Sequence, residues 1–465
     1  MRAASALRWE IWLQLALAVV TLALAAAGAG SILNVAFLPL AVGVAAILYQ
    51  RSPTRDYVGF CLWIWMLAPL VRRLADWSAG FNDFSLIIIA PLAVSLLTVT
   101  RAIRKSFWSY PPFSMIIVVY CYGALLGMFQ GQIVSATYTL ATFMAPVFFG
   151  CYVLSYPGRS QEIAETMLRT FIYATFFISV YAIDQYFNLR PWDAYWLAVA
   201  EISSVGLPFP QMFRLFGTLN SPGPFAIMLF VGILAMFSST SRLRWITPPL
   251  ALVSLALTLG RSAWGGLAIG LLMLLFLGQG FKRVKYALIG LVAAILALPL
   301  LSYEPISEAV LGRLQSVSNL SEDRSYNARV NFVDAILSQI DSLVLGNGLG
   351  VSGLGTKLGD AGANALKVFD NGVLDIFYNF GLVGFFVILA LVMMVYTALK
   401  NGAADDYARV SAAIAVGTIS QIVFSNALNG FGGMCIFPFM AIVVSRSVVA
   451  SRPQGVMPLQ RAFAR

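Results

Sequence analysis

Arginines stand at the ends of apolar runs, where their side chains could do chemistry. Arg214 and Arg261 each border such a run, and Arg324 and Arg329 lie within a long hydrophilic segment. A guanidinium group is always charged and binds phosphate oxygens through a planar fork of N–H donors. Several of these groups converging near one bilayer surface can hold a lipid diphosphate without a metal ion.

An acid and an amide, Asp370 and Asn371, precede another apolar run, and Asp375 follows within it. A charged side chain costs roughly 2.5–3.5 kcal/mol at the centre of a bilayer on insertion scales, so acids beside a span usually have a role. The N-terminal end of this apolar run is therefore a candidate functional site.

The elements that must position these residues are membrane helices. The chain is 60% hydrophobic and 11% charged, whereas a soluble domain has about 25% charged residues. A soluble protein is excluded, and we expect an all-α polytopic membrane protein forming a single integral membrane domain over residues 1–465. We expect about 14 transmembrane helices (12–14), at residues 11–30, 33–49, 57–71, 82–100, 112–129, 133–155, 164–186, 223–238, 245–260, 262–278, 285–301, 376–399, 408–427 and 433–449. The first, although it resembles a signal peptide, is interpreted as an uncleaved span.

The net charge of +10 is explained by the positive-inside rule, so no nucleic-acid partner is expected. With the N-terminus in the cytoplasm, every short loop predicted to be inside carries a positive charge, and both termini are cytoplasmic. The remaining basic residues gather on the other side, mostly in loop 187–222, at Arg261 and in the large loop 302–370. Long loops in a compact membrane protein are more often functional than idle.

Several kinds of chemistry are disfavoured by what the chain lacks. It has no histidine, which removes the commonest general base and metal ligand. Its four cysteines form no metal-binding spacing, so neither a metal nor a cofactor is expected. The glycines Gly348, Gly350 and Gly353 match a dinucleotide motif but are interpreted as a turn. Asp405-Asp406 is interpreted as a solvated loop pair, which disfavours a transferase that uses a soluble nucleotide-sugar donor.

Four segments occur in an order that is known from one group of enzymes: "RLFGTLNSPGPFA", "GRSAWGGLAIGLLMLL", "NARVNFVDAILSQIDSLVLGNGLG" and "DNGVLDIFYNFGLVG". This set, between residues 212 and 390, resembles the bacterial O-antigen ligase and O-antigen polymerase superfamily. The N-terminal half agrees with that family only in its hydrophobicity. Asp370 stands where ligases carry histidine, and Phe332 and Ser342 stand where the family has tryptophan and proline. The missing histidine favours a polymerase-type relative over a ligase.

The resemblance implies a C-type glycosyltransferase-like fold in the bacterial inner membrane and an active site that faces the periplasm. It implies metal-independent, inverting glycosyl transfer from a polyprenyl-diphosphate-linked oligosaccharide donor to a glycan acceptor, either a lipid-linked chain or a lipid A core. The product would be a surface polysaccharide or exopolysaccharide. Membrane lipids, and other polysaccharide assembly proteins, are further expected partners.

Within that mechanism Arg261 and Arg329 would stabilise the departing diphosphate, and Asp370 would accept the proton of the acceptor hydroxyl. The expected substrate-binding residues are Arg214, Arg324, Asn371, Trp264 and Tyr326, with the two aromatic side chains as sugar-stacking faces or as interfacial belt residues.

Two alternatives from other classes remain open at this point. A transporter or flippase of lipid-linked sugars would also need many spans and cations on one face. It would more often show two related halves and charges at mid-membrane, and the sequence shows neither. A non-catalytic scaffold for polysaccharide assembly would not need the arginine and aspartate set.

Overall fold

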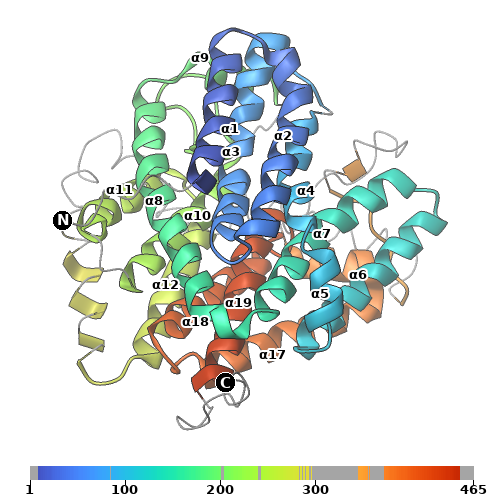
Figure 1. The fold of residues 1–465 in the computed structure, drawn as a ribbon, viewed down its shortest axis with the longest axis vertical. Coiled ribbons are helices and arrows are strands. Elements are labelled where there is room, and N and C mark those ends of the chain that lie inside the picture. The colour runs from blue at the N-terminus through green and yellow to red at the C-terminus, as the bar shows by residue number, and fades with distance from the viewer. Residues whose placement is uncertain are drawn as a thin grey trace, which may run out of the picture.

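The computed structural model describes residues 9–83, 85–200, 204–238, 242–281, 344–353, 355–356 and 371–450, with scattered positions between 283 and 295. These residues form helices and connecting turns with no strand among them (Figure 1). Within the described part, nine helical segments are long and apolar enough to cross a membrane. The all-helical, multi-pass membrane class predicted from the sequence is thereby confirmed.

The helix bounds, in chain order, are α1 Trp9–Ala26, α2 Gly30–Arg51, α3 Asp56–Ala79, η1 Leu86–Ile89, α4 Ala90–Leu96, α5 Val99–Ser106, α6 Pro111–Phe129, α7 Ile133–Leu154, η2 Pro157–Arg159, α8 Ser160–Phe187, α9 Pro191–Val199, α10 Pro222–Ala235, η3 Met236–Ser238, α11 Leu243–Leu257, α12 Arg261–Leu277, α16 Gly372–Phe380, η6 Gly381–Gly384, α17 Phe385–Asn401, α18 Asp406–Ile419, η7 Ser420–Val423 and α19 Gly430–Ala450. Each predicted span overlaps described helices except 285–301, which lies mostly outside the described residues; span 376–399 covers parts of α16 and α17 with η6 between them. The total of about 14 spans therefore stays a prediction.

One predicted span, 82–100, differs from the structure in its shape. Its residues form η1 and α4, and the chain then turns and continues as α5. The Thr98 hydroxyl donates to the Ser95 carbonyl at this turn. The basic residues that follow this span, which the sequence analysis placed in a cytoplasmic loop, lie within α5. Helix α5 is amphipathic. It buries Ala102 and exposes Arg104 and Lys105.

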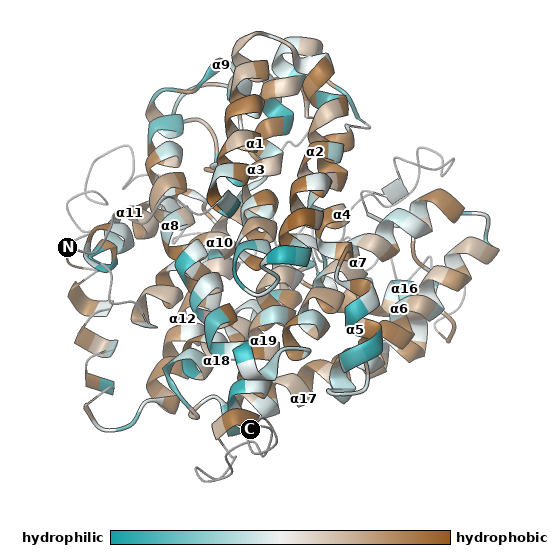
Figure 2. Cartoon of the chain, viewed as in Figure 1, coloured by the Kyte–Doolittle hydropathy of each residue, from teal (hydrophilic) through white to brown (hydrophobic). Residues whose placement is uncertain are grey.

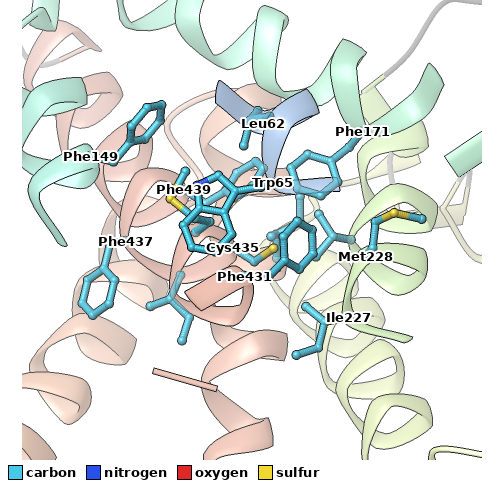
Figure 3. Packing of buried hydrophobic residues seen from close by; sticks show 14 of the residues in the cluster. Leu62, Trp65, Phe149, Phe171, Ile227, Met228, Phe431, Cys435, Phe437 and Phe439 are labelled. Atoms are coloured by element: carbon cyan, nitrogen blue, oxygen red, sulfur yellow. The ribbon is translucent and has the colours of Figure 1, made fainter. Parts of the chain in front are cut away.

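Helix α19 forms the centre of the molecule and packs against α7, α8, α10, α17 and α18. Every residue from Phe431 to Val443 is buried, as expected for a helix that is apolar on all sides. Figure 3 shows Phe431, Phe437 and Phe439 of this helix among side chains from the surrounding elements. Close approach depends on small residues, since a Cβ at Gly150 of α7 would lie 2.9 Å from Phe437.

The outer surface of the bundle is apolar over most of its height. Helix α1 buries only three of its residues and exposes Trp12, Val19 and Leu22. Figure 2 shows hydrophobic residues along the faces of the long helices, with hydrophilic segments concentrated near helix ends. Exposed apolar surface of this extent is the pattern of helices in contact with lipid.

A buried ion pair fixes one of the predicted extracytoplasmic loops. Arg73 of α3 donates to Asp193 Oδ1 of α9 at 2.6 Å and to the Gly217 carbonyl at 2.6 Å. Both side chains of the pair are fully buried. The Tyr181 hydroxyl donates to the other oxygen of Asp193. Loop 187–222 is therefore held against α3 and α8 on its way to α10.

The glycine-rich segment 344–353 is a turn, as the sequence predicted, and it packs against α6 and α7. Gly348 and Gly350 both have positive φ angles, at 78° and 93°, which disfavour residues with a Cβ atom. A Cβ at Gly348 would lie 2.4 Å from the Gly127 nitrogen, and one at Gly350 would lie 2.5 Å from the Ala136 nitrogen. Of the predicted loop 302–370, only 344–353 and 355–356 are described.

Candidate functional site

A cavity of about 440 Å³, with a largely apolar wall and one cluster of polar side chains, lies beside the starts of several helices. Its lining comes from α3, η1, α4, α7, the start of α10, the glycine-rich turn, α16 and the turn before α19: Trp65, Ile88, Leu92, Tyr138, Thr139, Thr142, Phe143, Ser221, Pro224, Ser352, Gly353, Gly355, Asp375, Asn379, Ser425, Asn426, Asn429 and Gly430. Helices α4, α7, α10, α16 and α19 all begin beside it. The cavity thus extends from helix ends that the charge pattern assigned to the extracytoplasmic side to Trp65 and Phe143 in the middle of α3 and α7.

Asp375 is the polar centre of this cavity and is 5% exposed. Asn379 Nδ2 donates to its Oδ1 atom at 2.8 Å, and Asn426 Nδ2 donates to its Oδ2 atom at 2.5 Å. The Ser352 hydroxyl donates to Asn379 Oδ1 at 3.3 Å. The carboxylate is therefore held in one orientation by α16, the glycine-rich turn and the turn before α19.

The sequence interpretation did not include Asp375, Asn379 or Asn426 among the site residues. Asp375 was visible as an acid inside an apolar run, which is itself a functional signal. Its partner Asn426 carried no signal, because it lies 51 residues away in the chain.

Arg214 lies on the segment that leads from the ion pair to α10. Its Nε atom donates to the Thr258 carbonyl at 2.8 Å, and the Leu215 N–H donates to the Leu257 carbonyl at 3.1 Å. Arg214 also lines a second cavity of about 330 Å³, together with Leu259. Leu259 has a positive φ of 52°, a strained value that is uncommon outside glycine. Arg214 thus contacts the tight turn that leads into Arg261.

Arg261 is the first residue of α12 and is half-buried. The next residue, Ser262, accepts a hydrogen bond on its carbonyl from Gln421 Nε2 at 2.8 Å. Trp264 is partly buried, and its indole N–H donates to the Leu255 carbonyl at 3.0 Å. The polar edge of Trp264 therefore serves to join α12 to α11, and its role in sugar stacking stays a prediction.

Asn371 caps the start of α16. Its Oδ1 atom accepts from the N–H groups of Val373 and Leu374 at 2.9 and 3.2 Å. A Cβ at the next residue, Gly372, would lie 2.9 Å from the carbonyl oxygens of both Ile422 and Ser425. The start of α16 therefore packs closely against Ile422 of η7 and against Ser425, which follows η7.

Replacing Asn371 separates the capping role from the predicted role in substrate binding. Asn371→Ala should lower stability by about 0.5–2 kcal/mol, whereas Asn371→Ser should keep the cap and the stability. Thermal unfolding of both variants in detergent measures this difference. If Ser destabilises as strongly as Ala, the capping assignment is wrong; if Ser is stable but inactive, the amide acts on substrate.

The other predicted site residues, Asp370, Arg324, Tyr326 and Arg329, lie outside the described residues. Asp370 directly precedes the cap residue Asn371 in the chain. Within the described part, no group of three or more His, Cys, Asp or Glu side chains is placed to hold a metal ion.

No protein-family model matches the chain, and comparisons with curated proteins and with solved structures find no match.

Proposed function

We propose that this chain is a membrane glycosyltransferase that uses a polyprenyl-diphosphate-linked oligosaccharide and extends a surface polysaccharide or exopolysaccharide at the periplasmic face of the inner membrane. The proposal rests on the motif order in residues 212–390 and on one structural observation. The start of α12 and the start of α16 meet on the same short segment.

That segment is Gln421–Ser425. Its first residue bonds the carbonyl of Ser262, directly after Arg261. Its last residue lies against Gly372, two positions after Asp370. Arg261, a predicted phosphate-binding cation, thus begins a helix that shares one support with α16, whose first residue lies two positions after the predicted proton acceptor Asp370 in the chain.

In this mechanism the departing diphosphate develops negative charge, which Arg261 and Arg329 stabilise while Arg214 and Arg324 position the donor. Asp370 accepts the proton of the attacking hydroxyl as the glycosidic bond forms at the anomeric carbon and the bond to the diphosphate breaks. The two arginines that lie within the described part, Arg214 and Arg261, are supported by one tight turn. Arg261 is thereby held at the start of α12, and Arg214 is held against the turn before it.

The buried carboxylate in the cavity favours a transferase over a scaffold. Asp375 with its two amide partners forms a polar cluster, and such clusters inside a membrane protein usually serve a ligand.

Deleting the gene for this protein from its host tests the proposal and distinguishes a polymerase from a ligase. If it is a polymerase, single repeat units should accumulate on the lipid carrier and surface polymer should be lost. If it is a ligase, long chains should accumulate on the carrier. Unchanged amounts of both carrier-linked and surface glycan would contradict a role in glycan transfer.

A further inference from the structure

The cavity around Asp375 differs in charge from the arginine region, and this difference bears on what it binds. Among its described lining residues, Asp375 is the one charged side chain, and the rest of the polar lining is amide and hydroxyl. Among those described lining residues, a diphosphate or a uronic acid would meet a carboxylate and no cation. Its volume of about 440 Å³ falls within the range of small-molecule sites, about 300–1,000 Å³.

The hydrogen-bonding capacity of the cavity suits a ligand that is rich in hydroxyl groups. A carboxylate has about four acceptor positions, and Asp375 receives one amide donor on each oxygen. Each oxygen therefore retains capacity for a further O–H donor. The buried Thr139 hydroxyl, also on the wall, has no hydrogen-bond partner among the described residues.

An aromatic side chain, Trp65, completes the lining. The Trp65 indole N–H donates to Ser95 Oγ at 2.9 Å, so its polar edge is engaged within the protein while the side chain borders the cavity. The weakly positive C–H groups of a sugar ring are attracted to the negative face of such a ring system. Figure 3 shows Trp65 beside Phe431 and Cys435.

We infer that this cavity binds an uncharged, hydroxyl-rich sugar ring of the glycan acceptor, and that Asp375 excludes anionic sugars and diphosphates from it. The inference rests on the proposed function and adds a specificity to it. The donor diphosphate binds at the arginine region, and the neutral acceptor ring occupies the Asp375 cavity.

Two threonines on α7 give a matched test. Thr139 lines the cavity and its buried hydroxyl makes no hydrogen bond among the described residues, whereas Thr137, two residues earlier, is exposed and donates to the Ile133 carbonyl. Thr139→Val removes a hydroxyl that makes no hydrogen bond among the described residues, so stability should stay equal or rise while sugar binding weakens about three- to ten-fold. Thr137→Val should leave sugar binding unchanged, and Thr139→Ser should retain it.

Binding is measured on the full chain in nanodiscs by saturation-transfer NMR. The probes are neutral methyl glycosides of glucose, galactose, mannose, rhamnose and N-acetylglucosamine, with methyl glucuronide and geranyl diphosphate as anionic probes. We expect at least one neutral glycoside to bind in a Thr139-dependent manner. We also expect Asp375→Asn to raise the affinity for methyl glucuronide relative to the neutral probe. Should Thr139→Val not accumulate, Thr139→Ala replaces it.

The inference is overturned if no neutral glycoside binds, if Thr139→Val and Thr137→Val behave alike, or if methyl glucuronide binds the unaltered chain as well as the neutral probes. Failure of the proposed function gives a different result. Neutral glycosides would then bind in a Thr139-dependent manner, but the chain would transfer no glycan from a lipid-linked donor.

Discussion

Asp370→Asn should lower glycan transfer by about 10²–10⁴-fold, the usual contribution of a general base. The substitution keeps the shape of the side chain and removes its ability to take a proton. The variant is expressed in a host that lacks the chain, surface polysaccharide is quantified, and protein level is checked by blot. Loss of polymer at normal protein level is the expected result.

The control for this substitution is Asp184→Asn. Asp184 is a partly exposed carboxylate at the end of α8, where it binds Arg190. Because its side chain is partly exposed and pairs with the exposed Arg190, its replacement should leave polymer within about two-fold of the unaltered chain, as for surface substitutions in general. Normal polymer with Asp370→Asn would remove Asp370 from the mechanism and leave it as a residue before the α16 cap.

Arg73→Met should destabilise the protein by about 3–5 kcal/mol, because it leaves Asp193 buried without its cation. The pair is fully buried and joins α3 to α9, and the same guanidinium binds the Gly217 carbonyl. Segment 213–221, which carries Arg214 and ends at the cavity wall, should lose its anchor. Thermal unfolding in nanodiscs measures the stability loss, and proteolysis of loop 187–222 reports its release.

A second ion pair at the same end of the bundle is the control. Arg190 and Asp184 are exposed by 46% and 34% at their side chains, so Arg190→Met should cost about 0–1 kcal/mol. The double variant Arg73→Met/Asp193→Leu should regain much of the lost stability, since it removes the unpaired charge as well. Equal effects of Arg73→Met and Arg190→Met would refute the structural role of the buried pair.

Hydrophobicity and loop charge were enough to predict the helical membrane class and the position of most spans. They were enough because a bilayer demands long apolar helices whatever the function. The break between α4 and α5 was not predicted, since a hydropathy window continues across the turn at Thr98 and does not register how the chain bends there.

The candidate site was predicted only in part, because the residues that form it lie far apart in the chain. Arg214 and Arg261 were identified by residue type, but the hydrogen bond from Arg214 to Thr258 has no sequence signature. Asp375 was seen as an acid in an apolar run, yet its partner Asn426 is an ordinary amide in sequence. Pairings such as Arg73 with Asp193, which are 120 residues apart, appear only when the helices are packed.

The most direct test of the central claim uses the purified chain in proteoliposomes with a polyprenyl-diphosphate-linked oligosaccharide and a chelator of divalent cations. The account predicts that free polyprenyl diphosphate is released in equal amount to new glycosidic bonds, with one diphosphate for each oligosaccharide transferred. Movement of the intact lipid-linked oligosaccharide across the bilayer, with no diphosphate released, would contradict the account and identify the chain as a transporter.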